Sequence, residues 1–233
     1  MTQAQSLPLF ARPEFQTIAG ATLRPGGLAP TERALALLDL QSGARVLDIG
    51  CGLGATARLL SARGCAVLAL DSSPGLLRRA DCPGAARLLG RAQMLPVRAA
   101  CLDAVFCECV LSLVDESDAV LAEISRVLKP DGWLVLSDLY RRGGAATPGS
   151  APEQGRGCLS GARSEADLQR ALAKARLVPE VFEDHSRLLA QLAGELIFAG
   201  LPAWELMPCH GEACANGGGK PGYFLCLAHN HCQ

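Results

Sequence analysis

The stretch VLDIGCGLG, residues 46–54, decides the fold, because a buried aliphatic run passes directly into closely spaced glycines. The run before the glycines predicts a strand that is buried on both faces, as in a parallel sheet. Gly50, Gly52 and Gly54 predict a tight turn onto a helix over 55–63, where a ligand can approach the backbone at the helix N-terminus. Their GxGxG spacing differs from the GxGxxG spacing of dinucleotide-binding folds.

Two acidic residues accompany this glycine turn. Asp48 lies at the end of the first predicted strand, and Asp71 closes the next one, AVLALD, 21 residues after Gly50. An acid at the second place suits the two hydroxyls of a ribose. Together, the acids and the glycines predict a site for a nucleoside-type ligand. Cys51 lies inside the turn, where any small residue would serve, and is interpreted as structural.

Outward from this centre, strands and helices alternate. DAVFC (103–107) and WLVLSDL (133–139) read as further strands, and VPEVFED (178–184) and GYFLCLAHN (222–230) as the last two. The pattern predicts an α/β fold: a single domain with a Rossmann-like, seven-stranded, mostly parallel and doubly wound sheet.

The predicted domain boundaries follow from composition. Residues 1–28 predict an irregular arm or lid before a domain at 29–233, and the helices predicted on either side of the sheet include 31–40 and 117–130. The loop-rich segments 141–163 and 201–221 are expected on the substrate side.

Composition limits the partners. The formal net charge of −1, from 22 basic and 23 acidic residues, gives no electrostatic reason to expect a nucleic acid or an anionic membrane. No apolar run approaches the length of a membrane span. We therefore expect a cytoplasmic protein with a small-molecule substrate, no nucleic-acid partner and no membrane partner, and leave the oligomeric state open.

Over residues 30–140 the chain resembles the class I S-adenosylmethionine-dependent methyltransferases, in the methyltransferase type 11 group. The resemblance implies S-adenosyl-L-methionine as cofactor. Arg91 stands where the family usually has an acid near the adenine, so the backbone of Ala92 and the side chain of Gln93 are expected to contribute there. The implied cofactor-binding residues are Asp48, Gly50, Cys51, Gly52 and Gly54 for the methionine part, Asp71 and Ser72 for the ribose, and Ala92 and Gln93 for the adenine.

A narrower resemblance is to arsenite methyltransferases. DAVFCECVLSL places Cys109 where that group has a cysteine after the fourth strand, and GCLSGA places Cys158 at a second cysteine position. Cys107 is then expected to pack within the sheet. Arsenic(III) is a soft centre that prefers sulfur ligands. The implied reaction is methyl transfer to a thiol-bound metalloid such as arsenite, with Cys109 and Cys158 as the catalytic residues.

Two alternatives stay open. In the first, the acceptor is a carbon or oxygen atom of a quinone or cofactor intermediate, Cys109→Ser and Cys158→Ser are nearly silent, and Asp138 or His185 serves as the base. In the second, the chain is a cofactor- or metal-binding accessory protein without turnover. The latter rests on the tail, which carries Cys209, His210, Cys214, Cys226, His229, His231 and Cys232. The Cys-x4-Cys spacing of Cys209 and Cys214 is unlike the spacing of common zinc sites, so no metal site is assigned. Cys226 can also be interpreted as a core residue of the last strand.

Overall fold

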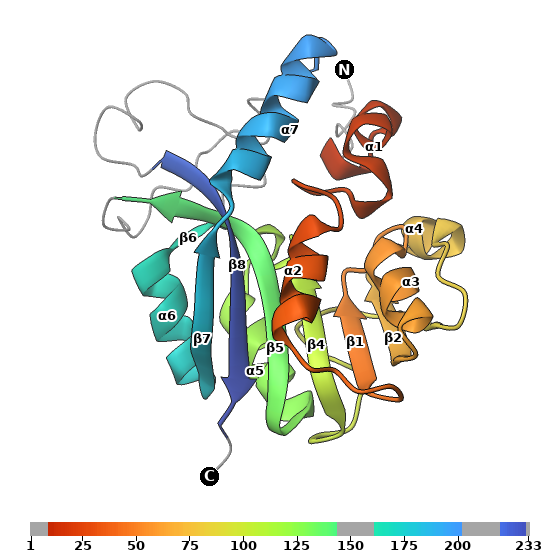
Figure 1. The fold of residues 1–233 in the computed structure, drawn as a ribbon, viewed down its shortest axis with the longest axis vertical. Coiled ribbons are helices and arrows are strands. Elements are labelled where there is room, and N and C mark those ends of the chain that lie inside the picture. The colour runs from red at the N-terminus through yellow and green to blue at the C-terminus, as the bar shows by residue number, and fades with distance from the viewer. Residues whose placement is uncertain (1–8, 144–160, 202–219, 232–233) are drawn as a thin grey trace, which may run out of the picture.

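The computed structural model describes residues 9–143, 161–201 and 220–231, which form a sheet with helices on both of its faces (Figure 1). The strand order is β3-β2-β1-β4-β5-β8-β7, and the short β6 pairs with β5 outside this path. The strands are β1 Arg45–Ile49, β2 Ala66–Asp71, β3 Ala86–Leu89, β4 Leu102–Glu108, β5 Leu128–Arg142, β6 Arg163–Ser164, β7 Leu177–Asp184 and β8 Lys220–Asn230. The predicted seven-stranded, mostly parallel sheet is thus confirmed, with the two-residue β6 as an addition.

Strand direction determines where a ligand can sit. β1, β2, β3, β4 and β5 run parallel, whereas β8 is antiparallel to both of its neighbours. The chain order changes direction between β1 and β4, which pair with Asp48 beside Phe106. Ligands of such sheets bind beyond the carboxyl ends of the strands at this kind of switch point.

The helices cover the sheet as two layers. Buried residues of α2, α3 and α4 pack with one face, and those of α5 and α6 pack with the other. The helices are α1 Pro13–Ala19, α2 Ala29–Leu37, α3 Ala55–Ala62, α4 Pro74–Arg79, α5 Ser117–Val127, α6 Glu165–Lys174 and α7 Ser186–Phe198, with short 3-10 turns η1 Leu9–Ala11, η2 Gly20–Thr22 and η3 Leu111–Leu113. Within the described ranges, none of these helices is long and apolar enough to cross a bilayer.

The N-terminal arm is more regular than its composition suggests. Residues 9–22 form η1, α1 and η2 rather than an irregular segment. Phe15 of α1 is buried against Leu192 and Leu196 of α7, so the arm is tied to a helix from the far end of the chain. Figure 1 shows α1 beside α7, above the carboxyl ends of the strands.

Candidate functional site

The glycine turn between β1 and α3 is shaped by crowding. Gly50 has φ of 68°, and a Cβ built on it would lie 2.3 Å from Val110 Cγ2. Gly54 has φ of 85° and is the N-cap residue of α3, where a Cβ would lie 3.0 Å from Cys82 Cβ. A side chain at either position would strain the left-handed backbone and require a neighbour to move, which explains the glycines that the sequence shows there.

Asp71 at the end of β2 holds the turn in place. Its Oδ2 accepts a hydrogen bond from the Gly52 backbone N–H at 2.9 Å, and its Oδ1 accepts one from Ser73 N–H at 2.8 Å. The Cys51 N–H donates to the carbonyl of Leu70 in the same strand. The two predicted parts of the site, the glycines and the second acid, are therefore in direct contact.

A cleft of about 260 Å³ opens beside this turn. It is lined by Gly50, Ser72, Ala92 and Gln93, four of the residues predicted from sequence, with the exposed Arg91 at its mouth. Ala92 is a buried hydrophobic residue, so this part of the cleft wall is apolar. These features suit a flat, partly apolar group such as a purine.

A buried ionic cluster lies close to the glycine turn, between the start of α3 and the end of β4, and no pattern in the sequence indicated it. Arg24, from the arm, lies 3.0 Å from Glu108 Oε2 at the end of β4, and both side chains are almost wholly buried. Arg24 Nη2 also donates to the hydroxyls of Thr31 and Thr56, at 2.5 and 3.1 Å. These hydroxyls in turn donate to Glu108, at 2.9 and 2.8 Å.

Two buried polar atoms beside the cluster lack a partner. They are Nε of Arg24, a donor, and Oδ2 of Asp48, an acceptor. Burial, and then the negative charge of Glu108, raises the pKa of Asp48 to about 8. Buried polar atoms normally make hydrogen bonds. The guanidinium donor fits the carboxylate of an amino acid, and the Asp48 carboxyl, once it has lost its proton, fits the ammonium group, so the residues present fit the methionine part of S-adenosylmethionine.

The two cysteines of β4 have different surroundings. Cys107 lies in the core, where burial raises the pKa of its thiol, as expected of a packing residue. Cys109 follows the strand with φ of 56°, its N–H donating to the Ser137 carbonyl and its Sγ lying 3.8 Å from Tyr223 Oη. Cys109 thus lies beyond the end of β4, whereas Cys107 lies within the strand. Cys158 lies outside the described residues.

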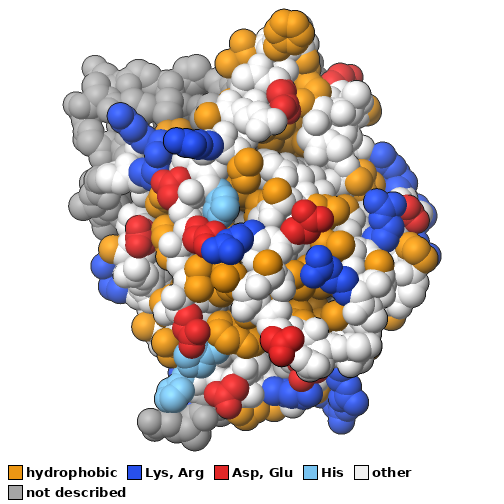
Figure 2. Space-filling view, viewed as in Figure 1, with side chains coloured by type: hydrophobic (Ala, Val, Ile, Leu, Met, Phe, Trp, Pro, Cys, Tyr) orange, Lys and Arg blue, Asp and Glu red, His pale blue; other side chains and the backbone are white. Residues whose placement is uncertain are grey.

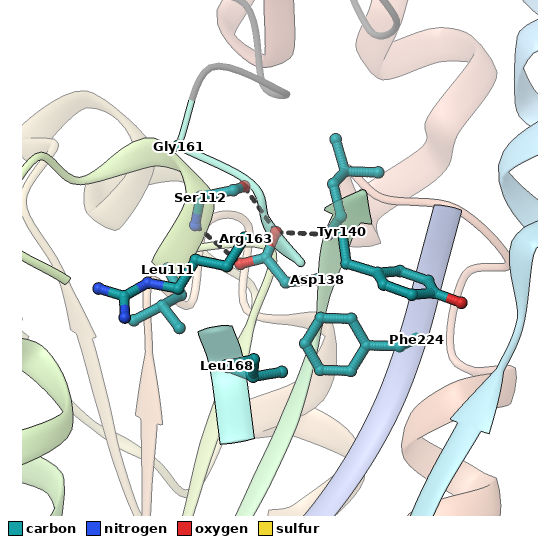
Figure 3. Close-up of a pocket in the computed structure, with 9 residues that line it drawn as sticks. Leu111, Ser112, Asp138, Tyr140, Gly161, Arg163, Leu168 and Phe224 are labelled. Carbon is teal, nitrogen blue, oxygen red and sulfur yellow. Dashed lines mark hydrogen bonds between the residues drawn. The ribbon is translucent and has the colours of Figure 1, made fainter. Parts of the chain in front are cut away.

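Asp138 is unsuited to the role of base that the sequence allowed. Its carboxylate accepts hydrogen bonds from the Ser112 hydroxyl at 2.6 Å, Ser112 N–H at 3.0 Å and Leu139 N–H at 2.7 Å (Figure 3). The neighbouring cavity, lined also by Gly161 and Arg163, measures only about 10 Å³. Asp138 therefore fixes the turn after β4. The other candidate, His185, is half-buried, and its Nε2 lies 3.0 Å from Glu183 Oε2, so that Nδ1 is not engaged by this carboxylate.

The tail is described only in part. Cys226 is buried in β8 and packs in the core, as the core alternative predicted. His229 Nδ1 lies 3.0 Å from Glu180 Oε1. Within the described ranges there is no group of three or more His, Cys, Asp or Glu residues that could hold a metal ion. Cys209, His210, Cys214 and Cys232 lie outside these ranges.

Comparison with known proteins shows which family this chain resembles. Residues 47–136 match the family model described as a methyltransferase domain. The chain is 37% identical over 110 residues to the malonyl-[acyl-carrier protein] O-methyltransferase of Serratia marcescens, covering 46% of this chain and 43% of that protein. It is 38% identical over 113 residues to the ubiquinone biosynthesis O-methyltransferase of Xanthomonas oryzae pv. oryzae, covering 46% and 47%. The chain thus spans under half the length of these curated relatives, and neither is an arsenite methyltransferase.

Solved structures extend the likeness to the whole fold. The [4+2]-cyclase SpnF superimposes with a TM-score of 0.75 at 22% identity, covering 97% of this chain and 94% of that one. Phosphoethanolamine N-methyltransferase 2 of Haemonchus contortus, in complex with S-adenosyl-L-methionine, gives a TM-score of 0.74 at 17% identity, covering 94% and 56%. At these identities the likeness establishes the fold alone.

Proposed function

Because this chain carries a class I S-adenosylmethionine-dependent methyltransferase domain, we propose that it transfers the cofactor's methyl group to an oxygen atom of a small molecule. The observation that carries the proposal is the convergence of the glycine turn, Asp71, and the unpartnered atoms of Asp48 and Arg24 at one edge of the sheet. Oxygen is preferred to other acceptors because the curated relatives named above are O-methyltransferases.

Each residue has a proposed role in holding the cofactor. Asp71 binds the ribose hydroxyls, with Ser72 beside them, and the cleft at Ala92 and Gln93 takes the adenine. Asp48 and the turn from Gly50 through Cys51 and Gly52 to Gly54 hold the methionine part. Bound there, the cofactor supplies an electrophilic methyl group on a sulfonium, and the protein contributes by orienting it toward the acceptor and excluding water.

An oxygen acceptor must lose a proton unless it already enters as an anion. Of the two candidates from sequence, His185 is the proposed base, because Glu183 orients its ring through Nε2 and does not engage Nδ1. We assign acceptor recognition to the arm, 1–28, and to the segments 141–163 and 201–221, as expected from sequence.

A thiol-bound metalloid is the second candidate acceptor. The position of Cys109 after β4, near Tyr223, favours it, since a non-glycine residue with positive φ is uncommon outside functional or strained sites. The left-handed backbone at Cys109 is also compatible with a purely structural turn, and no relative named above supports the metalloid.

The test is methyl transfer from isotopically labelled S-adenosylmethionine. The acceptors are malonyl-acyl carrier protein, a hydroxylated aromatic ring, and arsenite with glutathione, each offered to the wild type, Cys109→Ser and Cys158→Ser. We expect label on an oxygen acceptor, with at least half of the wild-type rate kept in both variants. Methylated arsenic from the wild type alone would replace this proposal with the metalloid one. A chain that binds the cofactor yet labels no acceptor would contradict both.

A further inference from the structure

The ion pair between Arg24 and Glu108 joins parts of the molecule that lie far apart in sequence. Arg24 belongs to the arm, Thr31 to α2, Thr56 to α3 and Glu108 to the end of β4. All four side chains are buried. A buried ion pair is not by itself a source of stability, because the cost of removing both charges from water offsets their attraction. Its presence therefore calls for an explanation other than stability.

The hydrogen bonds are unevenly distributed over the guanidinium of Arg24. The three contacts recorded above, to Thr31, Thr56 and Glu108, all involve Nη2. Nε, whose N–H lies on the same edge of the guanidinium as one N–H of Nη2, is buried and lacks a partner. Because the guanidinium is planar and its donors are held in a fixed fork, fixing Nη2 also fixes the direction of the Nε–H.

We propose that Glu108 is a positioning residue, which holds Arg24 so that its Nε–H is presented to the carboxylate of the cofactor's methionine part. The inference rests on the proposed cofactor site, and it assigns to Glu108 a role that the sequence did not suggest. Thr31 and Thr56 support it by donating to one carboxylate oxygen each. Binding of the methionine part thereby depends on the arm being docked on β4.

Replacing Glu108 by Gln tests this arrangement with little change in shape. Glutamine has one oxygen where Glu108 uses two as acceptors, so the hydroxyl of either Thr31 or Thr56 meets an NH₂ group instead. The charge that opposes Arg24 is also lost. Arg24 then takes several orientations, and the amino-acid part of the cofactor loses its fixed donor.

The experiment compares two ligands by isothermal titration calorimetry. S-Adenosylhomocysteine carries the amino-acid part, and 5′-methylthioadenosine lacks it. For Glu108→Gln we expect the dissociation constant of S-adenosylhomocysteine to rise at least tenfold and that of methylthioadenosine to change less than twofold. A matched control is Asp103→Asn, which removes a carboxylate paired with Lys129 at the opposite end of the same strand. It should leave both constants unchanged.

A second variant guards against simple loss of folding. Arg24→Met combined with Glu108→Leu replaces the buried pair with apolar side chains of similar size, which proteins often tolerate. It should unfold within a few degrees of the wild type and bind S-adenosylhomocysteine no better than methylthioadenosine.

Equal loss of both ligands in either variant, or loss of neither, would overturn the role of Glu108 while leaving methyl transfer intact as a proposal. A wild type that binds neither ligand would overturn the cofactor site itself.

Discussion

At the scale of single residues, Asp48 makes a prediction about pH. Its pKa is raised to about 8, chiefly by burial, whereas an aspartate in an unfolded chain titrates near 4. Between these values the folded chain holds a proton that the unfolded chain has lost, so the free energy of unfolding falls as pH rises from about 5 to 8. The slope from this group is at most about 1.4 kcal/mol per pH unit. Asp48→Asn should lack this contribution.

Urea unfolding of the cofactor-free chain at three pH values measures that slope. Taking the difference in the free energy of unfolding between wild type and Asp48→Asn removes the contribution of the groups that titrate in both proteins. If that difference stays constant from pH 5.5 to 7.5, Asp48 is ionised throughout and the raised pKa is wrong.

Residue-level prediction from sequence succeeded where spacing carries information. The glycines and Asp71 follow strands at fixed offsets, and the structure brings them into contact. Arg24 lies in a segment rich in Gly and Pro, 84 residues before Glu108, and no local pattern links the two. Asp138 lies near the end of the strand predicted over 133–139, as a catalytic acid would, but its hydrogen bonds to Ser112 depend on the fold of the turn after β4.

Asp138 is also the source of a prediction about that turn. Asparagine offers one acceptor oxygen where the carboxylate uses two, so Asp138→Asn leaves a buried donor unpaired. We expect the free energy of unfolding to fall by about 1–3 kcal/mol, measured by urea titration. Under saturating acceptor, the pH dependence of methyl transfer should match that of the wild type. Loss of the ascending limb of the pH profile would instead make Asp138 the base.

At the scale of an element, different outcomes are predicted for Gly50, in the turn from β1 to α3, and for Gly43, which precedes β1. In Gly50→Ala the new methyl meets Val110 Cγ2 at 2.3 Å, and the backbone is left-handed. Gly43 also has positive φ, of 83°, but a Cβ there meets nothing within 4 Å. Both variants carry backbone strain of about 1 kcal/mol. Only Gly50→Ala should also weaken S-adenosylhomocysteine binding, by at least tenfold in calorimetry.

Equal binding losses in the two variants would show that backbone strain, rather than crowding against Val110, governs the turn. Unchanged binding in Gly50→Ala would mean that Val110 moves aside without consequence for the site.

Elements were predicted best where hydrophobic periodicity is strong. β1, β2 and β4 lie within a residue or two of the predicted strands, and α3 begins at residue 55, as the helix predicted over 55–63 does. The helix predicted over 117–130 ends at Val127 instead, and β5 begins at Leu128. Pro130 and Gly132 signal a break, but pairing of Leu128 with Leu102 brings the residues before them into the sheet. Pairing with a distant strand is a tertiary effect that a local pattern does not contain.

At the scale of the whole molecule, the distribution of charged side chains on the surface agrees with an enzyme that acts on a small molecule. Figure 2 shows acidic and basic side chains interspersed on one face, as the net charge of −1 suggests. It also shows hydrophobic side chains at the top, where α7 ends, and there Phe198 is 96% exposed. The cofactor site could be predicted because each of its motifs is a contiguous stretch of sequence. Acceptor recognition depends on segments with little hydrophobic periodicity, and so could not be predicted.

The docking of the arm on α7 gives a final prediction that spans the chain. Phe15 is 2% exposed and packs with Leu192 and Leu196, so Phe15→Ala opens a cavity that costs about 3–5 kcal/mol. Phe198→Ala on the same helix should change the free energy of unfolding by about 0.5 kcal/mol or less. Urea unfolding followed by tryptophan fluorescence measures both.

The same pair of variants separates stability from site assembly. Because the arm carries Arg24, Phe15→Ala should also weaken the binding of S-adenosylhomocysteine more than that of methylthioadenosine, under conditions where the variant remains folded. Phe198→Ala should affect neither ligand. Equal destabilisation by the two substitutions would mean that α1 does not anchor the arm, and the coupling between the chain's first helix and its cofactor site would then have to come from the buried ion pair alone.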